Sequence, residues 1–139
     1  MTVSSSSEHA DMITIYHNAH CSKSRGALEI AQQFAADHAI ELNVVDYQKT
    51  PLTVPQLRAL HRTLQSDGTV TVRDMVRDGE EAYRQLHLER ADDDALLAAL
   101  AAHPILLQRP ILTFDGRGII ARPPELAERI LRPRAERSS

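Results

Sequence analysis

The sequence predicts an α/β fold with a mixed four-stranded sheet, and three observations indicate it. Residues 13–16 have a strand pattern that is followed by helical periodicity and by a second strand pattern at 42–47. Residues 111–121 have the pattern of a β-hairpin, and one more helix follows them. The region between these halves, 54–102, has only helical patterns. Because a βαβ unit pairs its strands in parallel and a hairpin pairs them antiparallel, the sheet should contain both kinds of pairing.

The first half of the chain is expected to form the βαβ unit. Ile13 to Tyr16 is apolar and β-branched, as strands often are. From Ser22 to about His38, apolar residues recur at helical spacing: Ala27, Ile30, Ala31, Phe34 and Ala35. Leu42 to Tyr47 is the second strand. The connection is short, so we expect a right-handed crossover.

The middle of the chain is expected to be a helical insertion. Residues 53–56 read Thr-Val-Pro-Gln, a capping box with proline near the first helical position, and Asp67-Gly68 ends that helical region. Short amphipathic pieces follow between Val70 and Leu88. The run Asp92-Asp93-Asp94 precedes a leucine-rich helix. Three consecutive side chains point in different directions around a helix, so this run is expected to cap the helix rather than bind a metal.

The last third is expected to form a hairpin and a final helix. Residues 111–114 and 119–121 are apolar strands on either side of the turn residues Asp115-Gly116. Pro123-Pro124-Glu125 begins a helix with one apolar face, made of Leu126, Ala127, Ile130 and Leu131. The order is therefore βαβ, a helical insertion, then ββα, which is the thioredoxin-like arrangement.

Composition limits the classes of function. The chain has 139 residues, 42% hydrophobic and 25% charged, with a net charge of -3, which does not favour nucleic-acid binding. We expect one domain at 12–132, a disordered leader at 1–11 and a polar tail at 133–139. No apolar run reaches the ~18 residues that a membrane span needs, and the start lacks a signal-peptide core. We therefore expect no membrane partner and a cytoplasmic location.

Cys21 is the only cysteine, and it stands where the first strand pattern gives way to a helix. A lone cysteine is often just a small buried hydrophobe. Here its neighbours His20, Ser22 and Lys23 are polar, and the site after a strand is where α/β proteins present ligands. Helix N-terminal N–H groups, together with Lys23 and Arg25, should lower the pKa of the thiol and favour a nucleophilic thiolate. With one cysteine, a redox cycle must use a second thiol from another molecule.

Arginine supplies almost all of the positive charge, since only Lys23 and Lys49 are lysines among 16 basic residues. Genomic base composition alone would spread arginines everywhere, so only placement identifies functional ones. Arg77, Arg109 and Arg122 each stand at an element boundary. A guanidinium group binds tetrahedral oxyanions through its planar fork, so these three together with Cys21 could form an anion site that contains a nucleophile.

From about Ile13 to Leu131 the chain resembles the glutaredoxin-coupled arsenate reductases of the ArsC family, and its Cys-Ser-Lys-Ser-Arg run is closest to the YfgD type. The matching motifs are residues 15–25, His-Pro-Ile-Leu-Leu-Gln-Arg-Pro-Ile at 103–111, and Arg-Pro-Pro-Glu at 122–125. The resemblance implies that Cys21 is catalytic. It further implies that His17 and Ser24 support the thiolate. By the same resemblance, the substrate oxyanion is bound by Arg77, Arg109 and Arg122, and Pro110 is the cis-proline beside the site.

The implied activity is reduction of arsenate to arsenite, with glutathione as co-substrate, glutaredoxin as partner and no bound cofactor or metal. The histidines do not have metal-ligand spacing. Two alternatives remain open. One is a glutathione-dependent thiol oxidoreductase that uses Cys21 without needing the arginines. The other is a non-enzymatic regulator similar to the Spx proteins, although those typically carry Cys-x-x-Cys and the fourth position here is Ser24.

Overall fold

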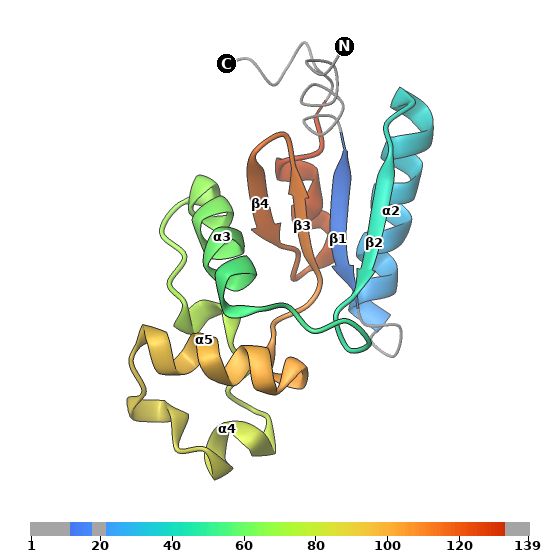
Figure 1. Ribbon diagram of the computed structural model, residues 1–139. Coiled ribbons are helices and arrows are strands. Elements are labelled where there is room, and N and C mark those ends of the chain that lie inside the picture. Colours follow the sequence, from blue (N-terminus) through green and yellow to red (C-terminus); the bar gives the residue numbers. More distant parts are fainter. Residues whose placement is uncertain (1–11, 18–21, 133–139) are drawn as a thin grey trace.

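The computed structural model describes residues 12–17 and 22–132, so the predicted leader, the predicted tail and Cys21 lie outside the described residues. Its centre is a four-stranded sheet in the order β2-β1-β3-β4 (Figure 1). The strands are β1 (Ile13–His17), β2 (Leu42–Asp46), β3 (Ile111–Phe114) and β4 (Arg117–Ile120). β1 pairs with β2 in parallel and with β3 antiparallel, and β3 pairs antiparallel with β4. The predicted mixed sheet and thioredoxin-like element order are confirmed.

Helix α2 (Ser22–His38) joins β1 to β2, as predicted. Its apolar stripe faces the sheet: the side chains of Ala27, Ala31 and Ala35 are buried. The ring of Phe34 packs edge-on against Phe114 of β3, with centroids 5.8 Å apart. Three alanines on this face let the helix backbone approach the sheet closely.

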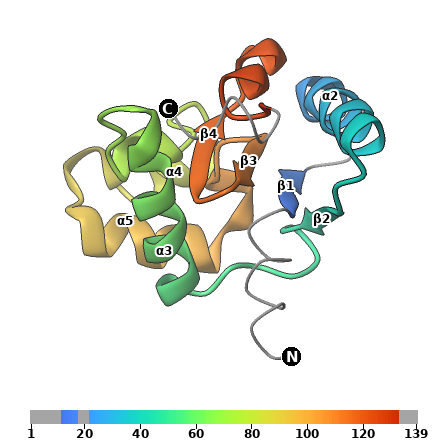
Figure 2. The same ribbon diagram turned by 90° about the horizontal axis from the view of Figure 1, so that it is seen from above.

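The two faces of the sheet bury different sets of side chains, because successive residues of a strand point to opposite sides. Figure 2 shows α2 and the 3₁₀ helix η5 (Pro124–Arg129) on one face and α3 (Val54–Leu64) on the other. On the α2 face the buried strand residues are Ile13, Ile15, Leu112, Phe114 and Ile119. On the α3 face, Ile111 is buried, and Tyr16 and Ile120 pack beside it.

The insertion has the predicted helices and caps. Thr53 and Gln56 form the capping box of α3, and Asp92 caps α5 (Asp93–Ala102) by accepting a hydrogen bond from the N–H of Ala95 at 2.9 Å. Between them lie η1 (Gln65–Asp67), η2 (Arg73–Met75), α4 (Glu81–Gln85) and η3 (Leu88–Arg90). Figure 1 places α4 and α5 beyond the end of the sheet at which β1 and β2 end.

Two details of the last third differ from the prediction. Asp115 and Gly116 have φ values of 55° and 76° and make a two-residue turn, so Phe114 pairs with Arg117 and β4 begins earlier than the predicted 119–121. The final helix is a 3₁₀ helix, since its hydrogen bonds run from the N–H of residue i+3 to the oxygen of residue i, such as Leu126 N–H to Pro123 O. Its predicted apolar side is buried at Ala127, Ile130 and Leu131, and Leu126 is partly buried.

Candidate functional site

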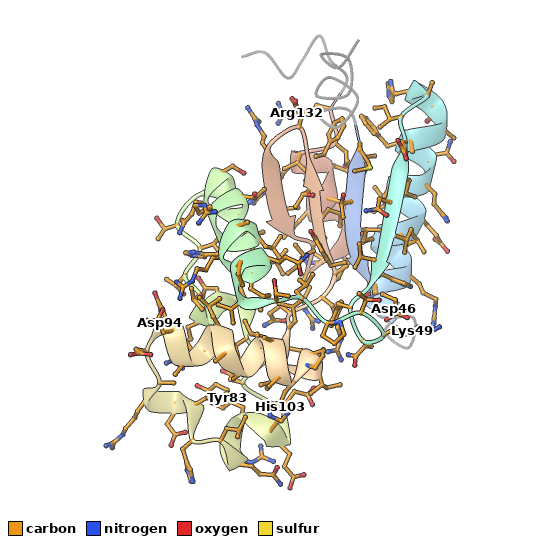
Figure 3. The ribbon with its side chains drawn as sticks, in the orientation of Figure 1. Asp46, Lys49, Tyr83, Asp94, His103 and Arg132 are labelled. Carbon is orange, nitrogen blue, oxygen red and sulfur yellow. The ribbon has the colours of Figure 1, made fainter. Side chains whose placement is uncertain are left out.

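The candidate site lies at the end of the sheet where β1 ends. His17 is the last residue of β1 and pairs with Asp46 of β2, while its neighbour Tyr16 pairs with Ile111, the first residue of β3. Pro110 and Arg109 come just before β3, so the chain delivers them to the same end of the sheet. Figure 3 shows Asp46 and Lys49 at this end and Arg132 at the opposite one.

His17 is a buried histidine, 8% exposed. Its Nδ1 atom is buried and has no hydrogen-bond partner among the described residues. Burial lowers the pKa of His17, the positive charge of Arg25 acts in the same direction, and the carboxylate of Asp46 opposes both. The imidazole is therefore biased towards its neutral form, in which one ring nitrogen donates a hydrogen bond and the other accepts one.

The first turn of α2 packs against the segment that follows β4. Ser24 is fully buried in this turn. A Cβ atom on Gly26 would lie 3.2 Å from Cγ of Pro124, so glycine is what permits the close approach. The N-terminus of α2, which Cys21 immediately precedes in the sequence, is thus placed next to the Arg122–Pro124 segment.

Arg109 and Arg122 lie together. Nη1 of Arg122 donates a hydrogen bond to the backbone oxygen of Arg109 at 3.0 Å. Arg109 is itself 8% exposed, and its Nη1 donates to the backbone oxygen of Ile105 at 3.1 Å, while its buried Nε has no partner among the described residues. The Arg109–Pro110 bond is cis, as the resemblance implies, and so is the bond after Arg122. A buried guanidinium with an unpaired N–H retains donor capacity for an anion.

The segment that carries Arg77 is joined to the segment before Arg109 by backbone hydrogen bonds. The backbone N–H of Arg77 donates to the oxygen of Leu106 at 2.7 Å, Val76 forms an isolated antiparallel bridge with Leu107, and the N–H of Gln108 donates to Met75 at 2.8 Å. The strip that carries Arg77 therefore runs beside the strip that leads into Arg109. Backbone bonds thus join the Arg77 segment to the Arg109 segment, and the side chain of Arg122 bonds to the backbone of Arg109.

The structure also shows two residues that the sequence did not single out. Glu80 forms an ion pair with Arg77, with 3.3 Å between Oε2 and Nε. Asp46 lies opposite His17 in the sheet and acts on its pKa. A sequence signal existed for each: Glu80 is an acid three residues after an arginine, and Asp46 is an acid at the end of the second strand.

Within the described part of the chain, no three His, Cys, Asp or Glu side chains gather into a group that could hold a metal ion. In the same residues, no helix is both long and apolar enough to cross a bilayer. The chemistry that this end of the sheet offers is anion binding by guanidinium groups beside a helix N-terminus.

Comparison with known proteins identifies the family. The model of the ArsC family matches residues 16–130. The chain belongs to the ArsC family. An arsenate reductase of Neisseria meningitidis is 38% identical over 121 residues, covering 86% of this chain and 97% of that protein. The uncharacterized Escherichia coli protein YfgD is 36% identical over 115 residues, covering 81% and 91%.

A solved structure agrees with this membership. The structure titled arsenate reductase from Vibrio cholerae superposes with a TM-score of 0.75 at 39% identity, covering 87% of this chain and 98% of that one. The resemblance to the ArsC family predicted from three motifs is therefore confirmed, and YfgD is among the relatives that match. The roles of the individual site residues stay predictions.

Proposed function

We propose that this protein is an arsenate reductase that works through Cys21 with glutathione and glutaredoxin as external thiols. The observation that supports it most is that the segments carrying Arg77, Arg109 and Arg122 lie beside one another at one end of the sheet, and that the Arg122 segment lies next to the helix that follows Cys21. Family membership adds to it, because several relatives of 34–38% identity carry the name arsenate reductase.

The proposed reaction needs two electrons, and two sulfur atoms provide them. The arginines bind the arsenate anion and offset its charge, so that the anionic sulfur of Cys21 can approach it. The sulfur displaces one oxygen, which leaves as water after protonation, and an S–As(V) bond forms. The glutathione thiolate then forms a bond to sulfur, the As–S electron pair stays on arsenic as it becomes As(III), and glutaredoxin reduces the resulting disulfide. Arsenite leaves, and Cys21 returns to the thiolate.

His17 and Ser24 are proposed to support the thiolate. His17 is buried at the end of β1, and its Nδ1 has no hydrogen-bond partner among the described residues, so this nitrogen is proposed to support the sulfur of Cys21. Ser24 is buried in the first turn of α2, where its hydroxyl and the helix N–H groups are close in sequence to Cys21. A thiolate stabilised in this way needs the reducing compartment that glutathione implies, so we propose a cytoplasmic location.

A coupled assay with arsenate, glutathione and glutaredoxin tests the proposal. The wild type should turn over arsenate, and Cys21→Ser should abolish turnover. Arg77→Ala and Arg109→Lys should each raise KM for arsenate, and circular dichroism should show that both variants remain folded. Arg84→Ala is the matched control, since Arg84 is an exposed arginine of α4.

The same variants distinguish arsenate reduction from the alternative function, a thiol oxidoreductase that acts on glutathionylated proteins. That activity uses Cys21 but does not need an oxyanion site. If the wild type reduces a glutathionylated protein and turns over no arsenate, and Arg77→Ala leaves that activity unchanged, the proposed function is wrong and the alternative holds.

A further inference from the structure

Glu80 is held against Arg77 by the local backbone. The N–H of Glu80 donates to the backbone oxygen of Arg77 at 3.4 Å, so residues 77–80 form a turn that brings the two side chains to the same side. Oε2 of Glu80 lies 3.3 Å from Nε of Arg77, and each side chain is 26% exposed. Both groups therefore remain open to solutes.

The position of Glu80 at the start of α4 makes this pairing notable. Glu80 occupies the N-cap of α4, with φ -80° and ψ 147°, yet its side chain makes no capping hydrogen bond. An N-cap side chain usually accepts from an N–H of the first turn. Here the carboxylate of Glu80 pairs with the guanidinium group of Arg77 instead of capping the first turn of α4.

The contact uses one part of the guanidinium group. A guanidinium has five N–H donors, one on Nε and four on the two Nη atoms. Glu80 approaches Nε, and among the described residues no acceptor lies within hydrogen-bond distance of the Nη atoms of Arg77. The backbone N–H of Arg77 is bonded to Leu106, and the guanidinium group is paired with Glu80 at Nε. Both ends of the side chain therefore have a partner, while the Nη donors have none among the described residues.

We propose that Glu80 is a positioning residue for oxyanion binding: it holds Arg77 through Nε so that the Nη groups face the bound anion. This inference rests on the proposed function, in which Arg77 binds the substrate. The competing possibility is that Glu80 occupies the place of the anion and weakens its binding. The contact is at Nε, and within residues 12–17 and 22–132 no acceptor occupies the Nη fork, which favours positioning.

Calorimetric titration with arsenate, and separately with sulfate as an unreactive tetrahedral anion, tests the inference. Glu80→Ala should weaken binding of both anions by about fivefold, the size expected for a partly exposed ion pair. Glu80→Gln should bind about as weakly as Glu80→Ala, because the amide keeps the shape of the side chain but carries no charge for the ion pair with Arg77. In the coupled assay, Glu80→Ala should raise KM by the same factor and leave kcat within about twofold.

Glu81→Ala is the matched control. Glu81 is exposed, lies one residue further along, and contacts Gln85 rather than Arg77, with Gln85 Nε2 donating at 3.1 Å. Because both alanine variants remove one negative charge, the general effect of charge on anion binding is the same in each. Only the variant that loses the contact to Arg77 should bind more weakly.

The outcomes distinguish a failure of the positioning role of Glu80 from a failure of the proposed function. If Arg77→Ala loses affinity but Glu80→Ala binds as Glu81→Ala does, or more tightly, the positioning role is wrong while the anion site stands. A Glu80→Gln variant that binds as tightly as the wild type also refutes it, since the ion pair with Arg77 would then not matter. A wild type that binds neither anion refutes the proposed function and the role of Glu80 together.

Discussion

Replacing Arg73 with alanine should loosen the whole segment that carries Arg77. The guanidinium of Arg73 donates from Nη1 to Oη of Tyr83 at 2.8 Å and to the backbone oxygen of Leu88 at 3.1 Å, and from Nη2 to the backbone oxygen of Ala91 at 2.7 Å. Tyr83 lies in the part of the insertion next to α5 (Figure 3). The side chain of Arg73 in η2 thus connects α4, η3 and the residue that follows η3, just before α5.

The magnitude follows from these three bonds. A hydrogen bond from a charged donor contributes about 1.5–3 kcal/mol, but bonds from one group are not additive, and Arg73 is partly exposed. We expect Arg73→Ala to lower the free energy of unfolding by about 2–4 kcal/mol, out of the ~5–15 kcal/mol typical of a domain. Arg73→Lys should recover less than half of the loss, because an ammonium group is compact and cannot reach three separated acceptors.

Urea unfolding measures this loss, and amide hydrogen exchange locates it. The N–H of Arg77, which is bonded to Leu106, should exchange faster in Arg73→Ala, while the amides of β1 and β3 should change less. Arg84→Ala, on the exposed side of α4, is the control and should stay within about 0.5 kcal/mol of the wild type. A loss in Arg73→Ala no larger than in Arg84→Ala would refute the reasoning. If Arg73→Ala does not fold, Arg73→Lys against the control decides it.

Three further changes test other parts of the structure. Because burial lowers the pKa of His17 from the ordinary 6.5, the unfolded chain binds that proton more tightly, so stability is full above this value and falls as the pH drops towards the lower folded pKa. His17→Gln should weaken the dependence of unfolding free energy on pH in this range, as measured by urea unfolding at several pH values. A dependence equal to that of the wild type would contradict the role of His17. Gly118→Ala places a Cβ 3.0 Å from Cγ2 of Thr63 and should lower the free energy of unfolding by about 1–3 kcal/mol. Adding Thr63→Ser removes Cγ2 and should restore most of this loss. If the effects of the two substitutions are additive in the double variant, this contact is not the cause. Asp92→Ala should cost about 1 kcal/mol in thermal unfolding through the lost cap on Ala95, whereas Asp92→Asn keeps an accepting oxygen and should cost much less; equal losses would rule out the cap.

The elements of this fold could be predicted from the sequence because each depends on residues that are close together along the chain. The stripe from Ala27 to Ala35, the capping box at 53–56 and the Asp115-Gly116 turn all act within a few residues. The candidate site residues were found by the same kind of signal, since arginines and a cysteine stand at element boundaries and the motifs around them are short.

What only the tertiary structure decided is how those boundaries meet. The bridge between Val76 and Leu107, which brings Arg77 beside the segment leading to Arg109, joins positions far apart in the sequence. The burial of His17 opposite Asp46 likewise follows from strand pairing. Such pairings depend on how complete elements pack against one another, and no local pattern encodes them. Helix caps, tight turns and side-chain periodicity are local and can be read from neighbouring residues, whereas the placement of charges around an anion site depends on the assembled core.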